Sequence, residues 1–170
     1  MEIGTIIIWI VIWILCFLSL VFTIIANRIS KKNIKNKSKM SFKESMDLVE
    51  LPIITFISDN NIKLNFLLDT GSNVSFINES ILQKLNYTLV DGVSDMIGVE
   101  GNKIENKICE IKISYKEYVF DTRFNINDMD NAFGVVKQES GVQLHGILGS
   151  LFFQKYKYAL DFESLTVYMK

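Results

Sequence analysis

The heptapeptide FLLDTGS at residues 66–72 runs an apolar strand directly into the polar turn Asp-Thr-Gly-Ser. Alone, this turn is a moderate signal, because an Asp side chain often accepts backbone hydrogen bonds where an ordinary strand ends. About 75 residues later, residues 144–149 read LHGILG and lead straight into SLFFQKY at residues 150–156. The two pieces in this order are far more specific than either one alone.

Residues 48–170 contain short runs in which apolar and polar residues alternate, a pattern that predicts β-strands. Turn-forming residues separate these runs into four expected hairpins, at residues 51–68, 96–107, 109–126 and 158–169. Short helices are expected at residues 78–85 and 150–156, with Asn78 and Ser150 as their N-caps. Many short strands with one or two short helices predict an all-β, closed-barrel domain.

This series of elements resembles the retropepsin-like aspartic proteases, and above all the bacterial single-lobe members. Their pattern is an apolar strand, Asp-Thr-Gly followed by Ala or Ser, a Gly-Leu/Ile-Leu-Gly element, a short aromatic helix and a final strand pair. The resemblance covers roughly residues 51–170. It implies the closed barrel of an acid protease and the hydrolysis of peptide bonds by an aspartic-type endopeptidase.

The resemblance also implies roles for residues around the Asp-Thr-Gly turn. Asp69 would be the catalytic carboxylate, Thr70 would lock the two active-site loops across a dimer, and Gly71 would donate its N–H to the carboxylate. Ser72 is expected to contact substrate, and its hydroxyl to hydrogen-bond the aspartate. Residues 147–149 are expected to pack beneath the loop.

A flap hairpin is expected at residues 97–102, since glycine there permits an unusual turn and a close approach to a substrate backbone. The expected substrate contacts in this flap are Ile97, Gly98, Val99 and Gly101. An extended peptide or protein segment would bind beneath the flap by strand addition.

The expected chemistry needs two carboxylates, but the chain has a single Asp-Thr-Gly and no repeat within residues 48–170. Two carboxylates a few ångströms apart share one proton and so supply both an acid and a base. A symmetric homodimer would bring two copies of Asp69 together on its two-fold axis. The alternative is the same fold dimerised at a membrane as a catalytically silent binding or regulatory module.

Other reactive residues are expected to be structural. His145 is read as a surface or hydrogen-bonded histidine, and Asp161 as a structural acid in the last hairpin. The chain has one histidine and no cysteine cluster, which argues against a metal site. It also lacks a glycine-rich phosphate loop, so no cofactor is expected. Cys16 and Cys109 are not expected to pair.

Residues 1–26 predict a single transmembrane helix. Ile3–Ala26 contains 24 uncharged residues, and a helix of that length rises about 36 Å, which is enough to cross a bilayer. A secretory signal peptide and a buried helix are the alternatives. A signal peptide has a positively charged start and a shorter apolar core, whereas this chain begins Met1-Glu2.

Residues 27–47 carry seven Lys or Arg against two acidic residues and are expected to form a flexible tether, with an amphipathic surface helix as the alternative. By the positive-inside rule, the domain at residues 48–170 is expected in the cytoplasm, on a single-pass anchor. A basic collar beside an acidic domain fits anionic lipid headgroups and argues against nucleic acid binding.

Overall fold

The computed structural model describes residues 13, 16–23, 41–97 and 103–169. The chain divides into two units, Met1–Lys37 and Ser38–Lys170. In the first unit, residues 16–23 are helical; most of the predicted membrane span at residues 1–26 lies outside the described residues. Within the described ranges, no helix is both long and apolar enough to cross a membrane.

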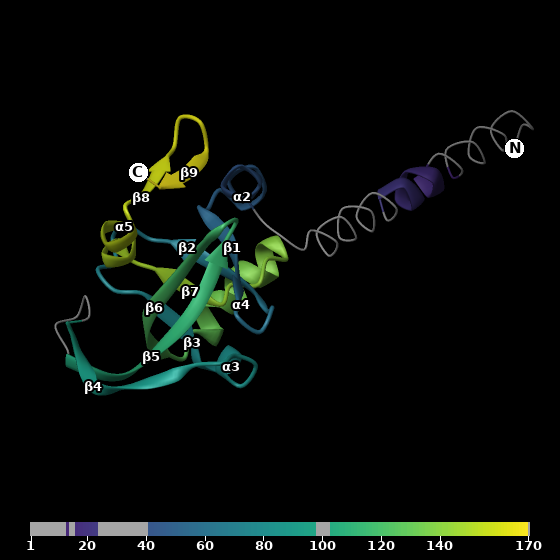
Figure 1. The fold of residues 1–170 in the computed structure, drawn as a ribbon. Helices are drawn as coiled ribbons and strands as arrows, with labels where there is room; N and C mark the ends of the chain where they lie inside the picture. The colour runs from purple at the N-terminus through teal and green to yellow at the C-terminus, as the bar shows by residue number, and fades with distance from the viewer. Residues whose placement is uncertain (1–12, 14–15, 24–40, 98–102, 170) are drawn as a thin grey trace, which may run out of the picture. The chain divides into compact units, whose positions relative to one another are not determined.

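The second unit is built on a closed β-barrel (Figure 1). Its strands are β1 (Ile53–Ser58), β2 (Lys63–Leu68), β3 (Phe76–Asn78), β4 (Thr88–Ile97), β5 (Lys103–Tyr115), β6 (Tyr118–Asn127) and β7 (Gly146–Leu148). They follow the order β1-β2-β7-β3-β6-β5-β4, and β1 pairs again with β5. This last pairing closes a ring of six strands, which confirms the predicted barrel.

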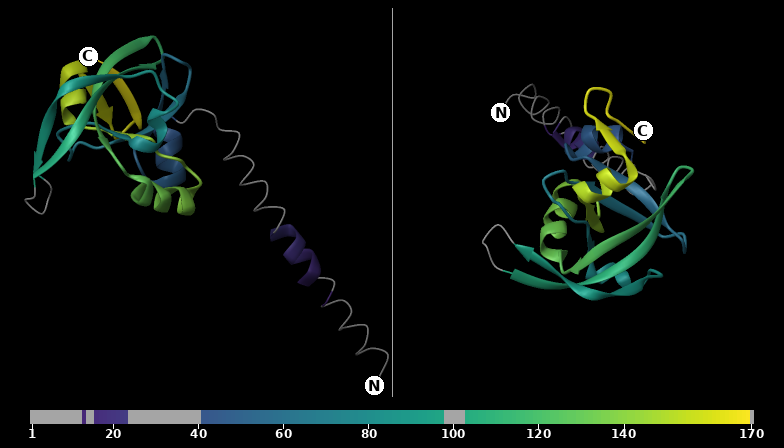
Figure 2. Two further views of the ribbon diagram at one scale, coloured as in Figure 1. Left: turned by 90° about the horizontal axis from the view of Figure 1, so that it is seen from below. Right: turned by 60° about the vertical axis from the view of Figure 1, so that its left-hand side comes forward.

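The strand β4 lies outside the ring and pairs with β5 in a long hairpin that extends away from the barrel (Figures 1 and 2). Pairing continues out to Ile97 opposite Lys103. This hairpin is where the flap was predicted, and Ile97 is the last residue of β4. The other predicted flap contacts, Gly98, Val99 and Gly101, lie outside the described residues.

The barrel interior is a cluster of aromatic and aliphatic side chains. Phe56 packs against three other phenylalanine rings, with centroids 5.8 Å away at Phe66, 5.9 Å at Phe120 and 6.1 Å at Phe152. Such mostly edge-on pairs add stability beyond the apolar area that they bury. Phe152 and Tyr158 are buried, so the aromatic stretch near the end of the chain contributes to this core.

Four helices accompany the strands between residues 41 and 169: α2 (Phe42–Val49), α3 (Glu79–Leu82), α4 (Asp130–Ser140) and α5 (Ser150–Tyr156). Helix α2 begins at a capping box in which Ser41 and Glu44 exchange hydrogen bonds. Its Phe42 is buried in the main core. The folded domain therefore begins before residue 48, inside the segment predicted as tether.

Helix α4 was not predicted. Its Phe133 packs with Ile53, Val142 and Leu144 in a second buried cluster, and Leu67 and Ile147 pack against this cluster from β2 and β7. Because β2 and β7 carry alternate residues into the main core, each of these two strands contributes to both clusters.

Of the two predicted N-caps, Asn78 occupies the N-cap position of α3, whereas the prediction of Ser150 for α5 is wrong by one residue. Asn78 precedes α3, but its side chain makes no capping bond; it donates to Asp130 Oδ1 at 2.7 Å and accepts from Met129 N at 3.0 Å. Ser150 is the first residue of α5, and Gly149 occupies the N-cap. At Asn78, contacts with the start of α4 thus take the place of a local capping bond.

The chain ends in the predicted hairpin, formed by β8 (Tyr158–Asp161) and β9 (Thr166–Met169). Asp161 accepts hydrogen bonds from the backbone N–H groups of Glu163 and Ser164 and from the Ser164 hydroxyl. These bonds, the one from the Ser164 hydroxyl first, hold the pKa of Asp161 below its usual value. Asp161 therefore stabilises a turn, which matches its predicted structural role.

Candidate active site

Asp69 stands where β2 leaves the barrel. Strand β2 runs parallel to β7, with Leu68 opposite Leu148, and the N–H of Asp69 donates to the Leu148 carbonyl oxygen at 3.0 Å. In turn β7 lies between β2 and β3, the two strands that flank the Asp-Thr-Gly-Ser turn. The position of this carboxylate is therefore fixed by a strand that begins 77 residues after Asp69.

The turn itself is folded around the Asp69 carboxylate. The N–H of Gly71 donates to Asp69 Oδ1 at 2.8 Å, as predicted, and the N–H of Ser72 donates to the Asp69 carbonyl oxygen at 3.3 Å. Asp69 is half-buried, while Thr70 and Gly71 are exposed. The Thr-Gly part of the turn is therefore exposed to solvent directly after the half-buried Asp69.

The predicted hydrogen bond from the Ser72 hydroxyl to the aspartate is wrong. This hydroxyl donates to the Val74 carbonyl oxygen at 2.8 Å. The hydroxyl therefore stabilises the part of the loop that follows the turn and does not bond the aspartate. The backbone of the same segment is bound by helix α5. Ser150 N donates to Ser72 O at 2.7 Å, and Leu151 N donates to Asn73 O at 3.1 Å.

The glycines of the HGILG segment are required by close backbone contacts. A Cβ at Gly146 would overlap the Phe76 carbonyl oxygen and the Phe66 ring, and a Cβ at Gly149 would overlap the Val74 carbonyl oxygen. Gly149 also donates its N–H to the hydroxyl of Ser75 at 3.1 Å. The segment thus packs against the Asp69 loop, as predicted for residues 147–149.

Ser75 is a supporting residue that the sequence analysis missed. Its side chain is buried, and its hydroxyl is the hydrogen-bond acceptor that joins the loop to Gly149. The available signal was its position, one residue before the buried strand β3, where an apolar residue would be the ordinary choice.

His145 is a hydrogen-bonded structural histidine, as predicted. Its Nδ1 accepts from the backbone N–H of Asn65 at 3.0 Å, and its backbone N–H donates to the Asn65 carbonyl oxygen at 2.9 Å. Burial, with smaller contributions from the charges of Lys84 and Lys137, lowers the pKa of His145 from 6.5 to about 4. The ring is therefore neutral at physiological pH.

The described residues contain no group of three or more His, Cys, Asp or Glu side chains arranged to hold a metal ion. Cys109 is a free, fully buried thiol, and this burial raises its pKa to about 12. A thiol with so high a pKa is a poor nucleophile at neutral pH.

No known protein family and no curated protein matches this chain. Solved structures with similar folds include the EIAV protease in complex with an inhibitor, with 24% identity over 65% of this chain and 92% of the other, at a TM-score of 0.47. The retroviral protease-like domain of Ddi1 from Leishmania major is 12% identical over 71% of this chain and 88% of its own, also at 0.47.

A retropepsin-like aspartic protease from Rickettsia conorii is 16% identical over 64% of this chain and 75% of its own, at a TM-score of 0.42. These structural neighbours are retropepsin-like proteins. Each similarity is distant, with at most 24% identity and a TM-score no higher than 0.47.

Proposed function

We propose that this chain is a membrane-anchored aspartic endopeptidase whose catalytic dyad forms when two chains bring their Asp69 carboxylates together. The observation that carries this proposal is the Asp69 loop. Its carboxylate accepts the Gly71 N–H at 2.8 Å, and the adjoining Thr70 and Gly71 are exposed at the edge of the domain.

The reaction needs two carboxylates with different proton occupancy. In a pair that shares one proton, the ionised carboxylate removes a proton from the attacking water, and the protonated one donates to the carbonyl oxygen of the scissile peptide. Each described domain contributes one Asp-Thr-Gly loop, so the second carboxylate comes from the partner. The two groups titrate as a unit, and the two apparent pKa values belong to the pair.

The substrate we propose is an extended peptide segment of a protein at the membrane surface. A strand-like peptide would lie between the Asp69 loop and the β4–β5 hairpin, with Ile97, Gly98, Val99 and Gly101 as its contacts. Strand addition favours unfolded or looped targets. The apolar run Ile3–Ala26 supports the anchor, and tethering in a membrane raises the effective concentration of partner chains.

The function is tested by incubating the full-length chain with a diverse peptide mixture from acid to neutral pH and identifying cut sites by mass spectrometry. Cleavage should disappear in Asp69→Asn, because an amide cannot share the proton of the pair. Asp59→Asn makes the same chemical change at an exposed turn and should leave cleavage intact. Cleavage that persists in Asp69→Asn would exclude the proposed mechanism.

Dimerisation is measured on the same samples by analytical ultracentrifugation in detergent. A chain that dimerises and cleaves nothing would establish the alternative, a retropepsin-like binding or regulatory module. Reporter fusions to the C-terminus test the proposed cytoplasmic location, and reporter activity on the outer side of the membrane would reverse the topology.

A further inference from the structure

His145 is the only histidine in the chain, and its ring takes part in the pairing of β2 with β7. The backbone N–H of His145 donates to the Asn65 carbonyl oxygen at 2.9 Å, and ring Nδ1 accepts the Asn65 N–H at 3.0 Å. Strand pairing then continues from Phe66 opposite Gly146. The ring therefore has the role that a backbone carbonyl normally has in a strand ladder, at the position where this ladder begins.

Asp69 lies at the other end of the same ladder. Its N–H donates to the Leu148 carbonyl oxygen at 3.0 Å, directly after the last paired residue of β2, Leu68. Strand β7 is only three residues long, so it has few bonds to β2. The contact between His145 and Asn65 is therefore a large part of what aligns β7 with the strand that carries Asp69.

Only the neutral ring of His145 can accept the Asn65 N–H. A protonated imidazole carries an N–H on both nitrogens, so Nδ1 would then meet this donor with a second donor. Burial lowers the pKa of His145 to about 4, and the charges of Lys84 and Lys137 add to that shift. The charged residues of the elements beside the ring are Lys63 of β2, Glu79 of α3, Lys84 just after α3, and Asp130, Lys137 and Glu139 of α4.

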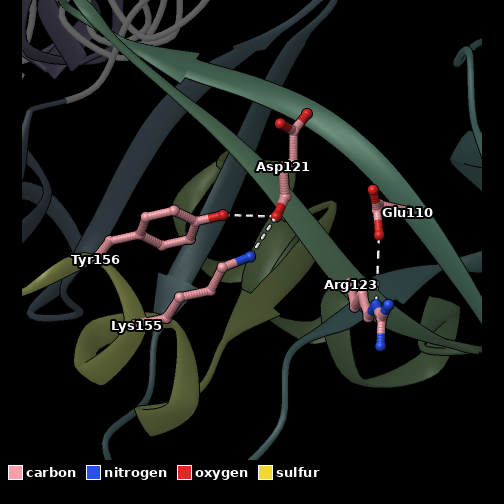
Figure 3. Close-up of polar contacts among 5 residues, drawn as sticks. All are labelled: Glu110, Asp121, Arg123, Lys155 and Tyr156. Carbon is pink, nitrogen blue, oxygen red and sulfur yellow. Dashed lines mark hydrogen bonds and ion pairs between the residues drawn. The ribbon is translucent and has the colours of Figure 1, made fainter.

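The far side of the loop is held by helix α5, through contacts that involve no histidine (Figure 3). N–H groups at the start of α5 bind the loop backbone. The helix itself is fixed to β6, because the Tyr156 hydroxyl and Lys155 Nζ both donate to the Asp121 carbonyl oxygen, at 2.5 and 2.9 Å. Tyrosine and lysine ordinarily keep their protons well above pH 7. Acid therefore acts on the β7 side of the loop and leaves these α5 donors in place.

We propose that His145 is a pH-sensitive positioning residue for Asp69, whose neutral ring holds β2 against β7 and whose protonation releases this side of the Asp69 loop. In acid, the imidazolium ring repels the Asn65 N–H and the first contact of the ladder is lost. Cleavage would then have an acid limit set by a histidine outside the pair of carboxylates. This effect on catalysis rests on the proposed function, whereas the release of the strand does not.

The test follows hydrogen exchange by mass spectrometry in the full-length chain in detergent from pH 7 to pH 4, in peptides covering residues 60–72. The matched variant is His145→Asn, because its amide oxygen can accept the Asn65 N–H and does not titrate. Both proteins are compared at each pH, so the intrinsic pH dependence of exchange cancels. With a ring pKa of about 4 in the folded chain and 6.5 in its ordinary state, the ratio of parent to variant exchange rates should rise at least about tenfold between pH 7 and pH 5.

Two further variants distinguish a switch from a loop that is merely weakened. His145→Leu has no acceptor for the Asn65 N–H, so its loop should exchange rapidly at every pH. Tyr156→Phe loses one contact of α5, and it should loosen the loop by a factor that does not change with pH. A parent-to-variant ratio that stays constant from pH 7 to pH 4 would overturn the proposal. If residues 60–72 in acid were as well protected as the core at residues 109–124, exchange would proceed by global unfolding, and local release would be excluded.

Peptide cleavage by the same proteins measures the effect on catalysis. Between pH 6 and pH 4, kcat of the parent should fall at least about threefold relative to that of His145→Asn, because the variant keeps its acceptor in acid. Parallel kcat profiles would refute the role of His145 in positioning Asp69. If neither protein cleaves at any pH, the proposed protease activity fails, and the hydrogen-exchange comparison still decides whether His145 releases the strand.

Discussion

Protonation of His145 should destabilise the domain on the acid side of neutrality. The folded chain partly buries His145, and this burial lowers the pKa of His145 from 6.5 to about 4, while Nδ1 accepts the Asn65 N–H. In the unfolded chain the ring titrates near its ordinary value. Between pH 6.5 and 4, the unfolded state therefore binds more protons than the folded state, and the free energy of unfolding falls as the pH falls.

The size of this effect follows from the two pKa values. A difference from 6.5 to about 4, at about 1.4 kcal/mol per pKa unit, corresponds to about 3 kcal/mol. The contribution is fully present above pH 6.5 and is lost by about pH 4. For a domain whose whole stability is about 5–15 kcal/mol, this is a large fraction.

The measurement compares the parent with His145→Asn by urea denaturation, followed by circular dichroism, from pH 7 to pH 4. An asparagine can present an amide oxygen to Asn65 N–H, but it does not titrate. The difference in unfolding free energy between the two proteins should change by about 3 kcal/mol across this range, while carboxylates such as Asp130 and Asp161 affect both alike. Parallel pH profiles would show that His145 is not a buried acceptor and would refute the reasoning.

Three substitutions and one labelling experiment test the packing around the site and the core. Gly149→Ala should cost about 3 kcal/mol in a denaturation experiment, because the new methyl group overlaps the Val74 carbonyl oxygen; a neutral result would mean that the loop is not held as described. Ser75→Ala should cost about 1–2 kcal/mol, since it leaves Gly149 N–H unpaired. Phe42→Ala should lower the free energy of unfolding by about 3–5 kcal/mol if α2 belongs to the domain. A loss below about 1 kcal/mol would show that Phe42 belongs to the tether and not to the folded domain. Cys109 should resist alkylation at pH 8 until the domain unfolds, and rapid labelling of the native chain would contradict its burial.

The sequence predicted the strands well where one face of each strand meets a core. In β2 the buried residues Leu64, Phe66 and Leu68 alternate with less buried neighbours, and this alternation is visible in the sequence. The first four residues of β1 are all buried, yet the short turn to β2 still identified the pair as a hairpin.

The helices α2 and α4 were missed for different reasons. The capping box of Ser41 and Glu44 is a readable signal, but the lysine-rich segment before it suggested a tether instead. Helix α4 buries Phe133 alone among its residues, so its apolar periodicity is too weak to indicate a helix. Gly141, whose positive φ of 76° ends α4, was a clue to its C-terminus.

In the candidate site, too, contacts between sequence neighbours could be predicted, whereas contacts between distant residues could not. Asp69 and Gly71 are neighbours in the sequence, so their mutual hydrogen bond could be predicted from the motif. The bond between Ser75 and Gly149 joins residues 74 positions apart, and no local pattern encodes it. The direction of the Ser72 hydroxyl depends on where the folded loop places the Val74 carbonyl oxygen, its acceptor.

The place of β7 between β2 and β3 has a consequence for how the protein is made. At a ribosomal rate of about 5–20 residues per second, about 4–15 s separate the emergence of the Asp69 loop from that of residues 146–151. Through that interval the nascent chain holds two strands whose inner edges have no partner, because the strand that joins them has not yet been synthesised. Unpaired edges are where chains aggregate. The nascent chain is therefore open to aggregation beside Asp69 until the three-residue strand β7 is synthesised and pairs with both edges.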